Sequence, residues 1–359
     1  MPKIAMITDT HFGCRNDNKA LHQYFEKSFK WFFNELESRG IRSIYHLGDL
    51  YDRRKYINFL TASKSREYFL DEIDRKQYQC HIITGNHDIY WKNTSEINAL
   101  DELVSGRYNT IFTYKDATEI PIAPGLDVLL VPWITPENNV RTHDMIRSTK
   151  AEIVMGHLEL DGFEMFKGMV SDHGEDKSIY DKFDLVFSGH YHHKSSKGNI
   201  HYIGAFAEYI WSDYKDPRGF TIFDTDTREF EFIQNPYSIF NIVFYDDEKE
   251  KNIMKKIKNT DYSKYTDTFV KVICSTRNDP YAFDLLIEKI HASSPIDVSI
   301  VEDMNILIGS DDEELDQTQD TPTILSGYIK SLTLPVDNDK MIAYMKEIYK
   351  EALTQEYID

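Results

Sequence analysis

The stretch Ser43-Ile44-Tyr45-His46-Leu47-Gly48-Asp49-Leu50-Tyr51-Asp52 decides how the rest of the sequence is interpreted. Its first five residues are apolar or favour β-structure, which predicts a buried strand that runs into a turn. Gly48 lets the backbone turn sharply, and Asp49 then stands at the end of the strand, where α/β proteins place their sites. Because a carboxylate has two oxygens, Asp49 could contact two metal ions at once.

Strands and helices alternate on both sides of this stretch. We predict a strand at residues 3–7, a helix at 20–38, a second helix at 59–73 and a strand at 81–83. The apolar residues of the first helix recur at helical spacing, and Gly40 is suited to end it. This β-α-β-α-β order predicts parallel strands with helices packed on the sheet.

The remaining patterns divide the chain into four parts, of which the first is 1–237. Within it we further expect a short helix near 95–104, antiparallel strands within 109–133, a helix at 138–149, strands at 153–155, 183–187 and 200–206, and a hairpin of 220–223 with 229–233. A second β-α-β-α-β pattern over 238–303 indicates a small α+β module. Residues 304–320 are acidic and typical of a linker, and 321–359 show two amphipathic helices.

Composition limits the class of protein. At 359 residues, 41% of them hydrophobic, the chain can form a large core and two or three domains. It has no run of 18 apolar residues and begins with a strand, so we expect neither a membrane helix nor a signal peptide. Cys14, Cys80 and Cys274 are widely spaced, which favours the cytoplasm over a disulfide framework or a zinc knuckle.

The formal net charge of −19 argues at first against a nucleic-acid partner, because phosphate binding usually needs a basic surface. The negative charge is uneven, however, and the segment after residue 301 is markedly acidic. A metal centre also supplies its own positive charge, so the acidity of the chain does not exclude a phosphodiester substrate.

Polar side chains follow five predicted strands, at the point where each strand ends. They are Asp9 and His11, Asp49, Asn86 and His87, His157, and His190 and His192. Each motif alone is weak evidence, but five strand ends would rarely acquire such residues by chance. Mixed imidazole and carboxylate ligands suit Mn²⁺, Fe or Zn²⁺ better than Ca²⁺. Two metal ions about 3.5–4 Å apart can share one carboxylate, and a neutral Asn ligand limits the negative charge facing a phosphate.

The motifs Asp9-x-His11, Gly48-Asp49-x-x-Asp52, Gly85-Asn86-His87-Asp88, Gly156-His157 and Gly189-His190-x-His192 resemble those of the calcineurin-like metallophosphoesterase superfamily. Their order, the small module and the terminal helices are similar to the double-strand-break repair nucleases, and the stretch Asp216-Pro217-Arg218-Gly219-Phe220 adds to this likeness. This branch includes the nuclease subunit of bacterial SbcCD and its archaeal, eukaryotic and phage counterparts. The likeness covers nearly the whole chain and is strong for residues 1–235. It implies an α/β sandwich of two mixed β-sheets flanked by helices, a small capping domain that binds DNA, and C-terminal helices that bind a partner.

The resemblance also implies two metal sites. One ion would be held by Asp9, His11, Asp49 and His192, and the other by Asp49, Asn86, His157 and His190, with Asp49 as the bridge. We expect Mn²⁺ in both sites, with Mg²⁺ as the alternative. His87 is not a ligand in this family; it would stabilise the transition state or help to protonate the leaving oxygen.

Asp52 departs from many cellular relatives, which have His at this position. Its carboxylate could orient His87 and raise the pKa of that imidazole, since a nearby negative charge favours the charged form. Alternatively, Asp52 merely caps the segment that follows it.

Several surface features have two interpretations. Arg53, Arg54 and Lys55 follow the Asp49 turn and could grip a phosphate backbone, with Arg15 and Lys92 as weaker candidates, or they could form a solvated loop. In relatives the region 59–104 forms a homodimer, although core packing would also explain its apolar residues. The helices of 321–359 cannot bury both apolar stripes alone, which favours partner binding; in the family the partner is an ABC-type coiled-coil ATPase.

The sequence therefore predicts a dinuclear-metal DNA nuclease, with double-strand exonuclease and single-strand endonuclease activity, that works with an ATPase in DNA repair, recombination and replication. It would act in the cytoplasm, or in the host cytoplasm if a phage encodes it. A protein phosphatase or a small phosphodiesterase is the first alternative, but such enzymes need neither the small module nor the terminal helices. A non-catalytic scaffold is the second, and the complete ligand set argues against it.

Overall fold

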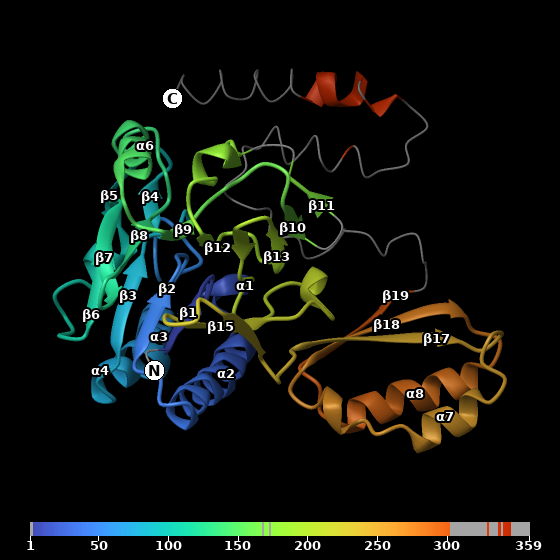
Figure 1. Ribbon diagram of the computed structural model, residues 1–359. Coiled ribbons are helices and arrows are strands. Elements are labelled where there is room, and N and C mark those ends of the chain that lie inside the picture. Colours follow the sequence, from blue (N-terminus) through green and yellow to red (C-terminus); the bar gives the residue numbers. More distant parts are fainter. Residues whose placement is uncertain are drawn as a thin grey trace, which may run out of the picture.

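The computed structural model describes residues 3–166, 169–171, 174–301, 329, 337–338 and 340–345. Within these residues the chain forms an α/β sandwich and a small module beside it (Figure 1). The expected acidic linker 304–320 and most of the expected helices of 321–359 lie outside the described residues.

The first sheet of the sandwich has six strands in the order β16-β15-β1-β2-β3-β6. The four strands from β1 to β6 are parallel to one another, whereas β15 and β16 are antiparallel to their neighbours. The bounds are β1 (Lys3–Ile7), β2 (Ser43–His46), β3 (Gln79–Ile83), β6 (Ile111–Tyr114), β15 (Gly219–Asp224) and β16 (Phe230–Gln234).

The second sheet also has six strands, in the order β13-β14-β12-β9-β8-β7. Its centre, β14 to β8, is parallel, and the edge strands β13 and β7 are antiparallel to their neighbours. The bounds are β7 (Thr118–Ala123), β8 (Leu126–Val131), β9 (Ile153–His157), β12 (Leu185–Gly189), β13 (Ser195–Lys197) and β14 (Ile200–Tyr202). Both sheets are therefore mixed, as the resemblance implied.

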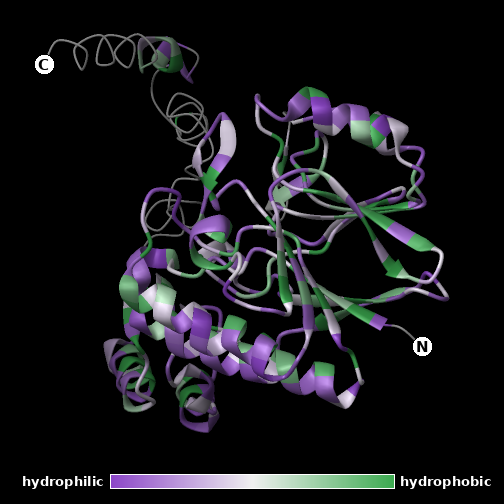
Figure 2. Ribbon diagram, turned by 90° about the vertical axis from the view of Figure 1, so that its left-hand side faces the viewer, coloured by the Kyte–Doolittle hydropathy of each residue, from purple (hydrophilic) through white to green (hydrophobic). Residues whose placement is uncertain are grey.

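The helices and two small hairpins surround the sheets. The helices of the sandwich are α1 (Cys14–Asp17), α2 (Lys19–Ser38), α3 (Phe59–Ser65), α4 (Asp71–Arg75), α5 (Ala99–Leu103) and α6 (Asn139–Ser148). The hairpins are β4 (Ile89–Trp91) with β5 (Thr94–Asn98), and β10 (Glu164–Phe166) with β11 (Met169–Val170). The helices at the lower edge of Figure 2 carry both hydrophilic and hydrophobic residues, as expected of helices with one buried face.

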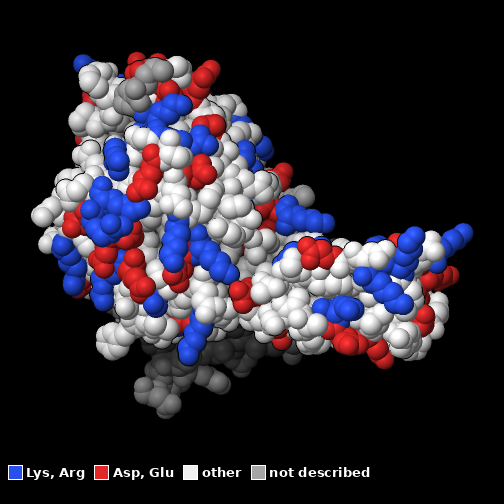
Figure 3. Space-filling model, turned by 90° about the horizontal axis from the view of Figure 1, so that it is seen from below, with Lys and Arg blue, Asp and Glu red and all other residues white. Residues whose placement is uncertain are grey.

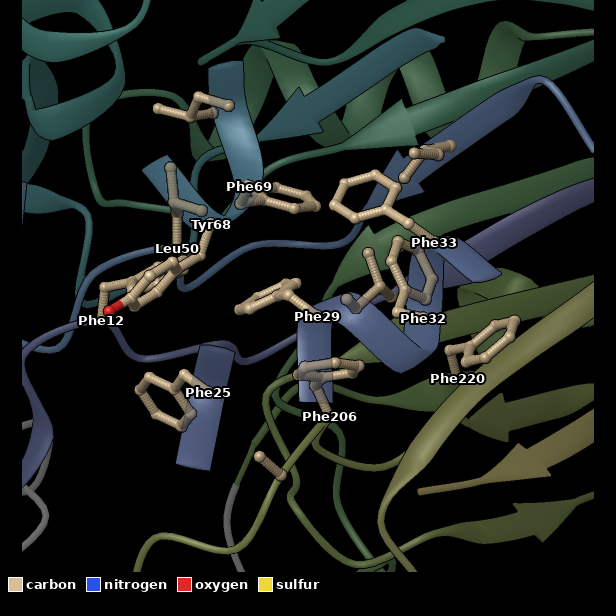
Figure 4. Packing of buried hydrophobic residues seen from close by; sticks show 14 of the residues in the cluster. Phe12, Phe25, Phe29, Phe32, Phe33, Leu50, Tyr68, Phe69, Phe206 and Phe220 are labelled. Atoms are coloured by element: carbon tan, nitrogen blue, oxygen red, sulfur yellow. The ribbon is translucent and has the colours of Figure 1, made fainter. Parts of the chain in front are cut away.

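Three layers of apolar side chains hold the sandwich together. Ile4, Met6, Val128 and Met155 belong to the layer between the two sheets. The outer face of the first sheet packs against α2, and the outer face of the second sheet packs against α6. Figure 4 shows the α2 layer, where Phe25, Phe29, Phe32 and Phe33 of the helix meet Phe12, Phe69, Phe206 and Phe220 from other parts of the chain. The predicted helix at 20–38 is thereby confirmed, one residue longer at its N-terminal end.

Three of the predicted elements are wrong in detail. The helix expected over 59–73 is interrupted by a π-helical turn, Arg66–Leu70, between α3 and α4. Three consecutive residues, 68–70, are buried there, and the wider turn brings all of them against the core. The helix expected near 95–104 is only α5, because 94–98 pairs with 89–91 as a hairpin. The strand β6 is not antiparallel to its successors: it joins the first sheet, parallel to β3.

The small module has a three-stranded parallel sheet, β17 (Phe240–Asp246), β18 (Phe269–Thr276) and β19 (Asp297–Val301). Two helices, α7 (Ile253–Asn259) and α8 (Pro280–Ala292), cover one face of this sheet (Figure 1). Apolar residues of the strands, including Val270 and Val272, pack against Phe283 and Ile290 of α8. The module therefore has a core of its own.

The module is joined to the sandwich through a buried carboxylate, that of Glu208. One of its oxygens accepts hydrogen bonds from the main-chain N–H groups of Ile239 (2.8 Å) and Phe240 (3.0 Å), where β17 begins. Phe240 and Phe269 also belong to the apolar layer around α2. Glu208 thus links the sandwich to the first strand of the module.

Among the described residues, no helix is long and apolar enough to cross a membrane.

Candidate metal centre

The polar side chains at the strand ends meet at one place, although they come from both sheets. Asp9 and His11 follow β1, Asp49 follows β2, and Asn86 and His87 follow β3 in the first sheet. His157 is the last residue of β9, and His190 and His192 follow β12 in the second sheet. Parallel strands of each sheet direct their carboxyl ends the same way, so the layering of the two sheets brings these loops together.

Asp9, His11 and His192 form the first group of side chains. The Nε2 atoms of His11 and His192 are 3.0 Å apart, and Asp9 Oδ1 lies 3.8 Å from the former and 3.9 Å from the latter. The side chains of Asp9 and His11 are almost fully buried, and that of His192 is 21% exposed. One atom from each is thus positioned to face a common point.

Asn86, His157 and His190 form the second group. The Oδ1 atom of Asn86 lies 2.9 Å from His157 Nε2 and 3.0 Å from His190 Nδ1. Asp49 stands between the two groups, because its Oδ2 is 3.4 Å from His157 Nε2 and 3.7 Å from His11 Nε2. The other oxygen of Asp49 accepts a hydrogen bond of 2.8 Å from the main-chain N–H of His87.

This arrangement fits divalent metal ions. Asp9 and Asp49 are at most 1% exposed, and their ion pairs among the described residues are all with imidazoles. His157 Nδ1 donates to the carbonyl of Leu47 (2.7 Å), which leaves the lone pair of Nε2 directed into the centre, as is usual for a metal-binding histidine. Within the described part of the chain, three sets of side chains could each hold an ion: Asp9 with His11 and His192, Asp9 with Asp49 and His157, and His11 with Asp52 and His87.

The charges of the centre shift the pKa values of its members. Burial lowers the pKa of His11, but the carboxylates of Asp52 and Asp49 outweigh it and raise that pKa to about 9. Burial likewise opposes the charge of His157, and the Asp49 carboxylate raises the pKa of this imidazole to about 9. Without metal, both imidazoles therefore hold an extra proton at neutral pH, which a metal ion must displace.

The backbone is strained at four of these residues. Asp9, His11, Asp49 and His190 have positive φ values of 50°, 42°, 56° and 85°, in the left-handed region that residues with a side chain rarely adopt. Such conformations cost on the order of 1–3 kcal/mol each, and they persist where the surroundings compensate. Here the two loops brace each other, because Asp9 N–H donates to the carbonyl of Gly48 (3.0 Å) and Thr10 N–H to that of Asp49 (3.0 Å).

Two glycines leave room for the centre. A Cβ atom on Gly48, whose φ is +95°, would lie 2.3 Å from Nδ1 of His157. A Cβ atom on Gly85 would lie 2.0 Å from Oδ1 of Asp49. Any side chain at these positions would push a member of the centre out of place.

Comparisons with known proteins show the family of this chain. The family model described as calcineurin-like phosphoesterase matches residues 2–194, which is more than half of the chain. The chain belongs to the calcineurin-like phosphoesterase family. It is therefore a phosphoesterase, an enzyme that hydrolyses phosphoester bonds, and its family uses divalent metal ions.

Two curated relatives resemble this phosphoesterase. Exonuclease subunit 1 of Enterobacteria phage T4 is 30% identical over 353 residues, which are 98% of this chain and 99% of the relative. The SbcD component of the nuclease SbcCD from Staphylococcus saprophyticus is 24% identical over 249 residues, which are 61% of this chain and 65% of the relative. Among solved structures, the GAP50 anchor in the inner membrane complex of Plasmodium covers 66% of this chain and 90% of its own, with 12% identity and a TM-score of 0.41.

His87 and Asp52 of this phosphoesterase do not make the contact expected from the sequence. The main-chain carbonyl of Asp52, and not its carboxylate, accepts a hydrogen bond of 2.5 Å from His87 Nδ1. The carboxylate lies 3.5 Å from His11 Nδ1 instead. The physical reason is the turn after Asp49, which points the Asp52 carbonyl toward His87 and its side chain toward His11.

The basic residues expected to grip DNA differ in how they are placed. Arg53 binds Asp17 (3.2 Å) and the hydroxyl of Tyr56 (2.7 Å), and its side chain is 15% exposed. Arg15 lies over the rings of Phe240 and Phe269 in the small module. Both cations are thus already engaged within the protein. Arg54 is half-buried, whereas Lys55 and Lys92 are exposed.

In the structure Asp88, the last residue of the motif 85–88, makes contacts near the centre, although no role was predicted for it from the sequence. Asp88 is 1% exposed and accepts hydrogen bonds from the main-chain N–H groups of Gly85 (2.9 Å), Leu50 (3.3 Å) and Tyr51 (3.1 Å). Burial, and then the nearby Asp49, raise the pKa of Asp88 to about 7. Asp88 ties the loop after β3 to the loop after β2, and its place directly after His87 was the available signal.

Tyr209 and Arg218 contact the main-chain carbonyls of Asp9 and His192. Asp213 accepts a hydrogen bond from Arg218, and the sequence predicted no role for any of the three at the centre. They lie outside the strand ends that carry the ligand motifs. The available signal was the stretch 216–220, which the resemblance includes and which contains Arg218.

Proposed function

We propose that this phosphoesterase is a DNA nuclease whose centre holds two divalent metal ions, most suitably Mn²⁺, with Mg²⁺ as a substitute. The observation that carries the proposal is the place of Asp49 Oδ2, which lies between His11 Nε2 and His157 Nε2 and so serves both groups of side chains. The near full-length likeness to a protein named exonuclease subunit 1 supports a nucleic acid as the substrate, and the resemblance to double-strand-break repair nucleases favours DNA.

The residues of the chain divide the work as follows. Asp9, His11, Asp49 and His192 would hold one ion, and Asp49, Asn86, His157 and His190 the other. Bound ions of this kind supply Lewis acidity toward the phosphate and lower the pKa of a coordinated water. Burial of the ligands excludes bulk water, which strengthens their interaction with charge that develops on the phosphate.

His87 would act on the leaving oxygen. Because a carbonyl only accepts hydrogen bonds, the Nδ1 that contacts the Asp52 carbonyl must carry a proton. Nε2 is then the nitrogen that can donate to the substrate when the imidazole is charged. Asp52 positions His87 through its main chain in this proposal, while its carboxylate acts on His11.

Two substitutions test the proposal. Asp49→Ala should abolish both Mn²⁺ binding and Mn²⁺-dependent cleavage of duplex DNA. His87→Ala should keep two bound Mn²⁺ and lose about 10²- to 10⁴-fold in turnover, the usual contribution of a general acid. Wild-type turnover in both variants would contradict the assignment. If a phosphopeptide or a small phosphodiester is hydrolysed while duplex DNA is not, the enzyme acts on that other substrate class.

The charges on the face seen from below (Figure 3) do not identify that face as a DNA-binding surface. On the face seen in Figure 3, below α2 and the helices of the small module, Lys and Arg are interspersed with Asp and Glu. We therefore attribute phosphate recognition first to the metal centre, and then to Arg54, Lys55 and Lys92, with Arg15 and Arg53 as supports. Neutralising Lys55 and Lys92 together should weaken DNA binding and reduce its salt dependence, as measured by fluorescence anisotropy.

We further propose that residues 321–359 bind an ABC-type coiled-coil ATPase. Both curated relatives are named as subunits, which supports a partner, and the two amphipathic stripes of this segment need an apolar surface to cover them. Deleting 321–359 should abolish co-purification with the ATPase and leave Mn²⁺-dependent hydrolysis of a small phosphodiester unchanged. Loss of both properties together would count against this partner site.

A homodimer through α3 is the remaining proposal about partners. Tyr56, Phe59 and Leu60 are 62%, 94% and 38% exposed, and we call them the α3 patch. Phe69, Leu70 and Leu100, which lie in the region expected to dimerise, are fully buried and belong to the core. The α3 patch is therefore one part of this region that is open to a second copy of the chain; Trp91 and Ile97 of the β4–β5 hairpin are also exposed, at 49% and 47%.

A further inference from the structure

The segment that follows β14 contacts the first group of the centre in three ways. The hydroxyl of Tyr209 donates to the main-chain carbonyl of Asp9. The ring of Tyr209 stands edge-on to His11, with centroids 5.4 Å apart, and to His192, at 5.6 Å. Tyr209 is only 3% exposed, so these contacts are made within the packed interior.

Two buried charged residues hold Tyr209 in place. One carboxylate oxygen of Asp213 accepts from the main-chain N–H groups of Tyr209 (2.6 Å) and Ile210 (3.0 Å). Its other oxygen accepts from Nη2 of Arg218 (2.6 Å). Asp213 is fully buried and Arg218 is 3% exposed, and hydrogen bonds of this charge-assisted kind are stronger than neutral ones.

Arg218 reaches the same group of the centre by a second route. Its Nη1 donates to the main-chain carbonyl of His192 (2.5 Å) and lies 2.9 Å from Asp216. The carboxylate of Asp216 in turn lies 2.9 Å from Nδ1 of His193, the residue that follows His192 in the chain. The peptide that carries His192 is thus held on both sides by residues of 216–218.

The side chains of the second group are oriented by other parts of the chain, although the main-chain N–H of His190 donates to the Asp9 carboxylate (3.1 Å). His157 is oriented by the carbonyl of Leu47 (2.7 Å), and the ring of His190 lies against Trp133, with centroids 5.0 Å apart. The contacts of Tyr209, Asp213 and Arg218 described above all lead to Asp9, His11 or His192.

We infer that Tyr209, Asp213 and Arg218 are positioning residues for one of the two metal ions, the ion that Asp9, His11 and His192 would share. The inference rests on the proposed dinuclear centre and adds to it a set of residues that none of the ligand motifs contains. Asp9 has a strained backbone with a φ of 50°. The Tyr209 hydroxyl holds the carbonyl of that residue, and so fixes the direction of its carboxylate.

The inference is tested by measuring Mn²⁺ binding to the full-length protein. Titration calorimetry and the electron paramagnetic resonance signal of free Mn²⁺ both measure this binding. In Tyr209→Phe, which keeps the ring and removes the hydroxyl, one of the two ions should bind about 3- to 10-fold more weakly, the usual effect of losing one hydrogen bond. The other ion should lose clearly less affinity, because its side chains contact neither Tyr209 nor Arg218 directly. Arg218→Lys keeps the charge but cannot span both Asp213 and His192, and it should weaken the same ion.

The matched control is Tyr245→Phe. Tyr245 is 1% exposed and its hydroxyl donates to the carbonyl of Asp279 (3.2 Å), within the small module. This variant should bind both ions as the wild type does. If Tyr209→Phe and Arg218→Lys leave both affinities unchanged, or weaken both ions equally, the inference is wrong. A wild-type protein that binds no Mn²⁺ would instead overturn the proposed function.

Discussion

Gly85 and Asp49 approach so closely that the space between them decides whether the centre can form. A Cβ atom at Gly85 would lie 2.0 Å from Oδ1 and 2.3 Å from the main-chain nitrogen of Asp49. Non-bonded atoms cannot approach this closely, so the loop after β2 would have to move. Since Asp49 serves both groups of side chains, such a movement would disturb both.

Gly85→Ala should therefore lose Mn²⁺ binding as well as catalysis, at unchanged secondary structure. Gly125→Ala is the control, because a Cβ atom there meets nothing within 4 Å. Its φ of +76° costs a side chain about 1–2 kcal/mol, so this variant should be less stable but bind Mn²⁺ normally. Calorimetric titration with Mn²⁺ compares the two, and equal affinities would refute the steric argument.

At the scale of elements, α3 has an apolar end that faces away from its own core. Its first residue, Phe59, is 94% exposed, whereas Phe69 in the π-helical turn that follows is fully buried. The π-helical turn thus separates a part of the predicted helix that packs inside from a part that does not. An exposed aromatic residue flanked by Tyr56 and Leu60 is the composition expected of a protein–protein contact.

Phe59→Asp should shift the protein from dimer to monomer, because a charge in the middle of an apolar contact is not compensated. Sedimentation velocity at several concentrations measures this shift. Val140→Asp on α6 is the control, since Val140 is 72% exposed but lies outside the α3 patch. The dimer proposal fails if the Phe59 variant and the control sediment alike.

At the scale of the whole molecule, the buried carboxyl group of Glu208 connects the sandwich and the small module. Burial raises the pKa of Glu208 from 4.5 to about 7, although N–H groups of Phe240 and Ile239 partly oppose this. The folded protein therefore holds a proton that the unfolded chain releases above about pH 4.5. Stability from this group is complete below that pH and is lost as the pH rises through about 7.

Glu208→Gln should remove this pH dependence. Between pH 5 and pH 8 the wild type should lose up to about 3 kcal/mol of unfolding free energy relative to the variant, since each pKa unit corresponds to about 1.4 kcal/mol. Urea denaturation at both pH values measures the difference. Glu229→Gln, at an exposed position of the same sandwich, should follow the wild type. A Glu208 variant that parallels the wild type across this range would refute the link.

Local sequence patterns determined much of this protein. The strand that precedes Asp49, the amphipathic helix at 20–38 and the polar residues after five strands could all be predicted, because periodicity and turn residues act between near neighbours in the chain. The resemblance supplied the two-sheet architecture. The types of ligand at the centre follow directly from the residues, whichever way the sheets are stacked.

Only the tertiary structure decided how these pieces meet. It placed β6 beside β3, turned the Asp52 carboxylate toward His11, and brought Tyr209 and Arg218 against the main chain of Asp9 and His192. Each of these contacts joins residues far apart in the chain or depends on the direction of one turn. Their energies come from packing and hydrogen bonds between elements, which no local pattern records. Asp49 and its place between two sets of ligands could be expected from the sequence and the resemblance, whereas its distances to His11 and His157 follow only from the way the two sheets stack.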